Sequence, residues 1–160
     1  ERTFQLVTQV AGRTGRGDKG GRVLVQTFSP EHPAIQAAAR HDYHAFAANE
    51  LPTRQQFGYP PYGRMIRLVV QGPQEKTTED FSEQISDRLA TAVAQSAETI
   101  RLLGPAAAPI SKLRGRFRFH LLLQAANGKT LRSLVAATVQ EIKCPGDLQL
   151  MIDVDPLSLL

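Results

Sequence analysis

The segment SKLRGRFRFHLLLQ, residues 111–124, decides the fold expected for the second half of the chain. Basic and apolar side chains alternate along it. A period of two residues is typical of a β-strand with one face in the core. The apolar side chains on one face are Leu113, Phe117, Phe119 and Leu121. The segment therefore predicts one long strand whose other face carries cations.

The neighbouring segments complete a β-α-β-β-α-β order. Alternating apolar patterns predict strands, and apolar residues at helical spacing predict helices. The strands are expected at 64–72, 101–110, 111–124 and 148–156, and the helices at 77–93 and 131–142. This order predicts an α+β (α/β) fold of the ferredoxin-like kind, an antiparallel sheet with two helices on one face.

The first part of the chain has a different pattern. A helix is expected over residues 1–12, a short buried strand over 21–28, and a second helix from Pro33 to Leu51. Three prolines and two glycines in 51–64 predict a loop. We therefore expect three parts, which are residues 1–51, a linker at 52–63, and a second domain at 64–160.

The basic residues are concentrated in one block. The chain has a formal net charge of +4, but between Arg101 and Lys143 eight Lys or Arg residues accompany a single acid, Glu141. Such a block points to an anionic partner, most simply nucleic acid. A solvated surface that happens to be basic is the alternative.

Composition excludes several classes of protein. No apolar run reaches the roughly 20 residues that a membrane helix needs, so no membrane partner is expected. The single cysteine, Cys144, excludes a disulfide framework and a cysteine-rich metal site within the chain, and we expect no metal here. The first residue is Glu1 rather than Met, which suggests a fragment or an excised domain.

The cations of the alternating segment predict a nucleic-acid contact. Arg67 from the first strand is expected to join them on the exposed face. A row of cations can follow a phosphate backbone without reading its sequence. Pairing with Asp153 and Asp155 is the competing interpretation, but two carboxylates leave an excess of positive charge. The residues predicted to contact DNA are Arg67, Lys112, Arg114, Arg116 and Arg118, with His120 on the same face.

The glycine- and arginine-rich segment TQVAGRTGRGDKGG, residues 8–21, predicts a different phosphate contact. It is not a Walker A motif, because Asp18 stands where the lysine is needed. Gln9, Arg13 and Arg16 are spaced i, i+4 and i+7, so they share one face if the helix continues past Gly12. Arginine forks can grip phosphate oxygens and stabilise charge during phosphoryl transfer.

These segments together resemble a known family. The glycine- and arginine-rich segment around residues 8–21 resembles motif VI of superfamily 2 helicases. The form it resembles is the one found in the C-terminal region of the PriA family of replication-restart helicases (primosomal protein N′). Further blocks resemble that family in the same order along nearly the whole chain. The matching blocks are QVAGRTGRGDKGGRVLVQT, SPEHPAIQAAARHDYHAFAANEL, FGYPPYGRMIRL, LGPAAAPISKLRGRFRFHLLLQ and DVDP.

The resemblance implies that residues 1–51 are the end of a RecA-like helicase lobe 2. Arg16 is then the catalytic arginine finger, Arg13 a second contact to the γ-phosphate, and Gln9 a residue that couples the lobes. ATP and Mg belong to the full-length enzyme, and zinc to a domain that lies upstream in this family. Because the Walker A lysine is absent, the chain alone is not expected to hydrolyse ATP.

The resemblance also implies a function. It is that of an ATP-dependent 3′-to-5′ DNA helicase, a hydrolase that recognises stalled or abandoned replication forks and restarts DNA replication by assembling a primosome. The implied partners are forked, single- and double-stranded DNA, single-stranded DNA-binding protein and other primosome proteins, in the cytoplasm at the nucleoid. The alternatives are a stand-alone nucleic-acid-binding module without helicase activity and a structural or protein-docking domain.

Overall fold

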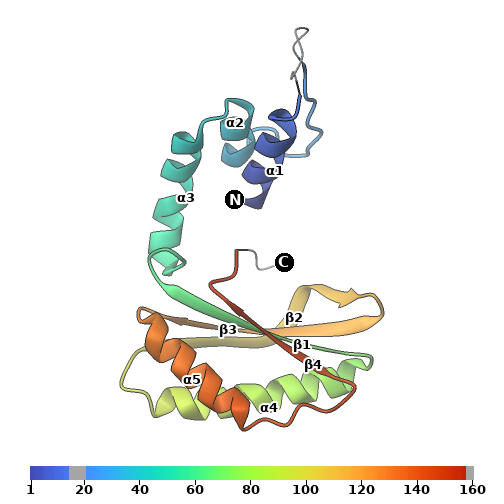
Figure 1. Cartoon of the computed structure of the whole chain (residues 1–160), viewed down its shortest axis with the longest axis vertical. Helices are drawn as coiled ribbons and strands as arrows, with labels where there is room; N and C mark the ends of the chain where they lie inside the picture. Colours follow the sequence, from blue (N-terminus) through green and yellow to red (C-terminus); the bar gives the residue numbers. More distant parts are fainter. Residues whose placement is uncertain (15–20, 158–160) are drawn as a thin grey trace. The chain divides into compact units, whose positions relative to one another are not determined.

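The computed structural model describes residues 1–14 and 21–157. The chain divides into two compact units, 1–56 and 57–160 (Figure 1). Each unit has its own small set of elements and its own buried cluster.

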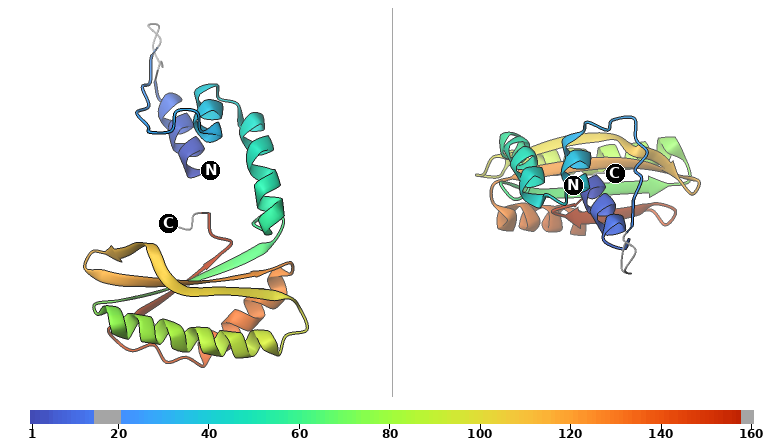
Figure 2. Two further views of the ribbon diagram at one scale, coloured as in Figure 1. Left: turned by 180° about the vertical axis from the view of Figure 1, so that it is seen from behind. Right: turned by 90° about the horizontal axis from the view of Figure 1, so that it is seen from above.

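The second unit contains four strands and two helices within its described residues. The strands form one antiparallel sheet in the order β2-β3-β1-β4, with both helices on one side of it (Figures 1 and 2). This confirms the predicted element order and the open antiparallel sheet. The elements are β1 (Arg64–Gly72), α4 (Glu75–Ala94), β2 (Ile100–Leu113), β3 (Arg116–Ala125), α5 (Gly128–Gln140) and β4 (Gln149–Val154).

The core of this unit lies between the sheet and the two helices. Alternate residues of the central strands β1 and β3 enter it, because directly paired residues such as Leu68 and Leu121 share a face. Both of these side chains are fully buried. The helices contribute Phe81, Ile85, Leu89, Leu131 and Val135. The inward face predicted for β1, with Ile66, Leu68 and Val70, is confirmed.

The long strand predicted over 111–124 is wrong, because the segment is a hairpin. Strand β2 ends at Leu113 and β3 begins at Arg116, so Arg114 and Gly115 form a two-residue turn. Their φ angles are 50° and 79°. Two consecutive positive φ values match the turn type that suits the twist of a two-stranded ribbon.

The turn changes which side chains share a face. Leu113 pairs directly with Arg116, and Lys112 pairs with Phe117. Leu113 is therefore on the face of Arg116 rather than in the core, and Lys112 is on the face of Phe117. The four cations that were predicted to lie along one strand are therefore divided: Lys112 is in β2, Arg114 is in the turn, and Arg116 and Arg118 are in β3.

Strand β2 is an irregular edge strand. Ala107 pairs with Phe119 and Lys112 with Phe117, so residues 108–111 of β2 lie opposite Arg118 alone. Pro109, which has no N–H to donate, lies in this bulge, where no ladder bond is required. The predicted proline-interrupted edge strand is confirmed, and it extends further than expected.

The first unit contains three helices within its described residues, α1 (Arg2–Ala11), α2 (Pro33–Ala39) and α3 (Tyr43–Phe57). The single helix predicted from Pro33 to Leu51 is interrupted, because His41 has a φ of 54°. Asp42 then caps the next helix, its Oδ1 accepting from the Ala45 N–H at 2.8 Å.

The loop predicted from residue 51 begins later than expected. Helix α3 continues through Pro52 to Phe57, although proline removes one backbone hydrogen bond from a helix. Two residues further along, Arg54 donates to Glu50 Oε1 at 3.0 Å and to Glu1 Oε2 at 2.6 Å. These ion pairs tie the second half of α3 to the start of α1.

The strand predicted over 21–28 is wrong. These residues have no regular secondary structure, and Leu24 and Phe28 are fully solvent-exposed. A strand needs a neighbour to satisfy its backbone N–H and C=O groups. The described part of the first unit contains no strand that could pair with this segment.

Candidate nucleic-acid interface

The sheet face that the helices leave uncovered carries most of the predicted DNA-contact residues. Direct pairing places Val69 opposite His120, and Gln71 opposite Arg118, on this face. Arg67 is on the same face, two residues along β1. The exposed edge residue Arg101 pairs with Gln124 and joins them. We call this surface the open face; its polar and charged members are Arg67, Gln71, Arg101, Arg116, Arg118, His120, Gln124, Gln149 and Asp153.

Arg67 has a carboxylate partner on the open face. Its Nη2 lies 3.1 Å from Asp153 Oδ2, and the two residues are directly paired between β1 and β4. The competing sequence interpretation is therefore confirmed for this arginine. Asp155 is also occupied, because it accepts from Arg64 at 3.1 Å and from the Met65 N–H at 3.0 Å.

Arg116 and Arg118 are held by backbone carbonyls instead. Arg116 Nη2 donates to the oxygens of Gln71 and Asp147, at 3.2 and 2.6 Å. Arg118 is only 9% exposed, and its Nη1 lies 3.4 Å from the oxygen of Ile110 in the β2 bulge. Neutral carbonyls leave the charge of a guanidinium uncompensated, so both arginines still contribute positive potential.

The pKa of His120 responds to this positive potential. Burial lowers the pKa of the imidazole below its ordinary value of 6.5, and the charges of Arg67 on β1 and Arg118 on β3 lower it further. Across β2 it pairs with Ala106, which carries no charge. Its Nδ1 is buried without a hydrogen-bond partner. The neutral imidazole is therefore favoured at pH 7 on this face.

This shift makes the stability of the chain sensitive to acid. Because the folded-state pKa of His120 lies below the unfolded value near 6.5, the unfolded chain binds more protons as the pH falls. The stabilisation is present above the unfolded pKa and is lost as the pH falls through the folded pKa. We expect His120→Gln to flatten the decline in unfolding free energy between pH 7.5 and 5.5.

Urea denaturation at a series of pH values measures that slope. His44→Gln, on the exposed surface of α3 in the other unit, is the matched control. Equal slopes for the wild type and both variants would contradict the assignment to His120.

The remaining two predicted residues lie at the end of the β2–β3 hairpin. The Lys112 ammonium lies 4.5 Å from the centre of the Phe117 ring, a cation–π contact with its cross-strand neighbour. Arg114 is exposed in the turn itself. Gly115 has open space around its missing Cβ. We call residues 110–115 the hairpin tip.

The structure thus divides the predicted residues into two groups. Arg67, Arg116 and Arg118 lie on the open face, partly or fully buried, while Lys112 and Arg114 lie exposed at the hairpin tip. Arg101 was not among the residues predicted from the sequence to lie on this surface. Its place just before an apolar run could have suggested an exposed site on an edge strand. The DNA-contact role of these residues stays a prediction.

The predicted nucleotide-contact residues are only partly described. Helix α1 ends at Ala11, and Gly12 and Arg13 follow in a turn. The continuous helix needed to align Gln9 with Arg13 is therefore not present. Both side chains are exposed, and Arg16 lies outside the described residues.

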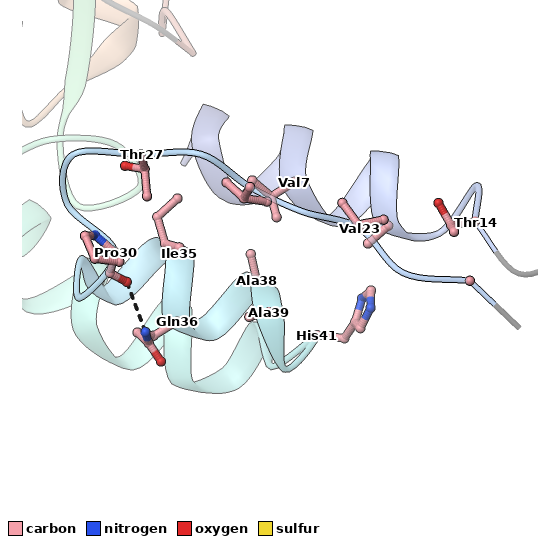
Figure 3. Close-up of a pocket in the computed structure, with 13 residues that line it drawn as sticks. Val7, Thr14, Val23, Thr27, Pro30, Ile35, Gln36, Ala38, Ala39 and His41 are labelled. Atoms are coloured by element: carbon pink, nitrogen blue, oxygen red, sulfur yellow. Dashed lines mark hydrogen bonds between the residues drawn. The ribbon is translucent and has the colours of Figure 1, made fainter.

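A pocket of about 420 Å³ lies in the first unit between α1, the 21–30 segment and α2 (Figure 3). Its described lining is largely aliphatic, with Val7 of α1 facing Ile35 and Ala38 of α2. Gln36 Nε2 closes one side by donating to the Pro30 oxygen at 3.0 Å. Gln9 and Arg13 are not among the described lining residues. Among the described lining residues the polar side chains are those of Thr14, Thr27, Gln36 and His41, and none of them is a cation predicted to contact a nucleotide.

Comparison with known proteins identifies the family. Residues 55–157 match the family described as the primosomal protein N C-terminal domain, PriA_C. The chain belongs to the PriA family. The PriA match spans all four strands and both helices of the second unit.

Individual PriA relatives extend the similarity to the first unit. The replication restart protein PriA of Synechocystis is 41% identical over 99% of this chain, and that of Haemophilus influenzae is 36% identical over 99%. The replication restart protein PriA of Bacillus subtilis is 31% identical over 100%. The chain spans only 18%, 22% and 20% of these relatives, about a fifth of their length.

The described part of this PriA chain shows neither a metal-binding cluster nor a membrane-spanning helix. Within residues 1–14 and 21–157, no group of three or more His, Cys, Asp or Glu side chains is arranged to hold a metal ion. None of the helices in the described part of the chain combines the length and apolar character needed to cross a bilayer.

Proposed function

We propose that this chain is the C-terminal part of an ATP-dependent 3′-to-5′ DNA helicase, a hydrolase that recognises stalled or abandoned replication forks and restarts replication by primosome assembly. The observation that carries the proposal is the similarity over 98–100% of the chain to proteins named replication restart protein PriA. The excess of positive charge on the open face and the hairpin tip supports nucleic acid as the ligand.

The proposal assigns a role to each part of the chain. Residues 1–51 are the end of a RecA-like lobe 2, 52–63 a linker, and 64–160 a DNA-binding domain. The β-α-β-β-α-β order and the strand order β2-β3-β1-β4 support a ferredoxin-like classification of that domain. The exposed apolar side chains of segment 21–28 are those expected of a strand whose sheet partners belong to the rest of such a lobe.

The nucleotide chemistry belongs to the full-length protein. Gln9 and Arg13 are exposed on α1 and in the turn after it, so they are accessible to a ligand held by another part of the protein. Arg13 and Arg16 would contact the γ-phosphate of ATP, and a Mg ion bound with the nucleotide would supply further positive charge there. Zinc would be held upstream of this chain. The proposed partners are DNA, single-stranded DNA-binding protein and primosome proteins, in the cytoplasm.

The DNA contact is proposed to combine both groups of cations. Lys112 and Arg114 at the hairpin tip are accessible enough to reach phosphates directly. Arg67, Arg116 and Arg118 hold positive potential on the open face, with donors already engaged by Asp153 and by carbonyls. Contacts of this kind bind backbone rather than sequence, which suits a protein that recognises fork structure.

Removal of the two exposed cations tests the DNA contact. Lys112→Ala with Arg114→Ala is expected to weaken binding of a forked DNA and to reduce the slope of log K against log salt by about 2, because each phosphate contact contributes roughly 1. Fluorescence anisotropy at 50–200 mM salt measures both quantities.

The control removes the same charge from the helix-covered side. Arg88→Ala with Lys143→Ala takes two cations from exposed positions on α4 and after α5. Equal losses in the two double variants would show that only net charge matters and would remove the hairpin tip from the interface. The chain could bind forks while the full-length protein has no ATPase activity. That result would favour the alternative of a stand-alone nucleic-acid-binding module.

A further inference from the structure

The hairpin tip exposes two large aliphatic side chains. Ile110 is 46% exposed and Leu113 is 45% exposed, and they lie three residues apart in the sequence. Leu113 is on the face of Arg116, and the carbonyl oxygen of Ile110 accepts a hydrogen bond from Arg118, which lies on that face. These two side chains at the hairpin tip form an apolar surface that the described residues of this unit leave exposed.

The charges around these side chains define what can cover them. Lys112 and Arg114 flank Leu113, and the sequence contains no Asp or Glu from Arg101 to Gln140. The partner is therefore negatively charged and must also present apolar surface. A nucleic acid combines the two, because stacked bases expose an apolar face where a duplex ends or its strands part.

The shape of the hairpin tip suits a segment that inserts into its partner better than a cavity that holds part of the partner. The turn residue Gly115 has no atom within 4 Å of the position of a Cβ, so the turn projects into open space. The hairpin behind it is braced by the Lys112–Phe117 contact and by Arg118 beneath the bulge. A convex, braced turn with aliphatic side chains resembles the apolar wedges that proteins insert between base pairs.

We propose that Ile110 and Leu113 insert at the junction of double- and single-stranded DNA and unstack the last base pair. Lys112 and Arg114 hold the phosphates on either side, so that the aliphatic side chains face the base pair. This inference rests on the proposed function, because it requires that the chain bind forked DNA. It goes beyond DNA binding, because it states that this domain itself opens the base pair at the junction without ATP.

A fork with 2-aminopurine in the last base pair tests the inference, since the fluorescence of this base rises when it unstacks. Saturating wild-type chain is expected to raise the signal. Ile110→Ser with Leu113→Ser is expected to remove most of that rise, while fork affinity changes by less than about threefold because the cations are retained. Leu103→Ser, at a 36% exposed position of β2 outside the tip, is the matched control and should leave the rise unchanged.

A second variant separates insertion from a general disturbance of the hairpin. Ile110→Ser with Leu113→Phe keeps one apolar side chain at the tip, and an aromatic ring can stack on a base. It should restore much of the fluorescence rise that the double serine variant loses. Circular dichroism confirms that each variant is folded.

Each remaining result contradicts a particular part of the inference. An unchanged rise in the double serine variant, or a wild-type chain that binds forks without any rise, overturns the wedge and leaves the DNA-binding proposal standing. Failure of the wild type to bind forks overturns both. If the double serine variant instead loses binding of an acidic, apolar peptide and keeps the DNA signal, the tip is a protein-docking surface.

Discussion

Replacing Arg16 with alanine in the full-length protein is expected to lower ATP turnover by about a thousandfold or more, because an arginine finger contributes roughly that much to phosphoryl transfer. The guanidinium acts on charge that develops only in the transition state, so ATP binding should fall far less than turnover. Arg16 lies outside the described residues. The expectation therefore rests on the resemblance of residues 8–21 to helicase motif VI and on membership of the PriA family.

DNA-stimulated phosphate release measures the turnover of this variant, and binding of a fluorescent nucleotide measures its affinity for ATP. Arg22→Ala is the matched control, because this exposed arginine directly follows the segment 8–21 and is not one of the residues predicted to contact the nucleotide. Arg13→Ala should also lower turnover. Near-normal turnover in Arg16→Ala would assign the γ-phosphate contact to another group.

The sheet could be predicted from the sequence because burial imposes its own period on a strand. Arg67 and Gln71, the polar residues of β1 on the other face, are partly exposed, while the core of the second unit contains Ile66, Leu68 and Val70. Arg67 was placed correctly on the opposite face for the same reason. Wherever a strand has one face in a core, alternation specifies which side chains can reach a ligand on the other.

Alternation failed where the chain reverses. In a continuous strand Leu113 and Arg116 point to opposite faces, but across a two-residue turn they are partners on one face. The signal that marks the reversal is Gly115, a glycine inside a strand pattern, next to Arg114 with a positive φ. The contacts of Arg116 and Arg118 with backbone carbonyls follow from the register between strands, which a single sequence does not specify.

The errors in the first unit have a different cause. Segment 21–28 has the composition of a strand, yet it has no neighbour to pair with in the described residues. Pro52 has the local character of a helix breaker, yet the ion pairs of Arg54 stabilise the helix around it. In the first place a partner strand is absent from the described residues, and in the second a contact with another helix is present. In both, the surroundings rather than the local preference of the residues decide the structure.

Gly104→Ala is expected to lower the free energy of unfolding by about 2–5 kcal/mol, the sum of backbone strain and a steric clash. Gly104 has a φ of 92°, and a Cβ added there would lie 2.6 Å from the carbonyl oxygen of His120. Both groups belong to the backbone of paired strands, so neither can move aside without breaking the sheet. Gly104 also lies where β2 shifts its register against β3, between Leu103 and Ala106.

Gly115→Ala separates the two contributions to that loss. Its φ of 79° is also positive, but nothing lies within 4 Å of the added Cβ. We therefore expect only the cost of strain, about 1–2 kcal/mol. Urea denaturation of both variants measures the difference, and equal losses would mean that the His120 carbonyl does not lie where the pairing of β2 with β3 places it.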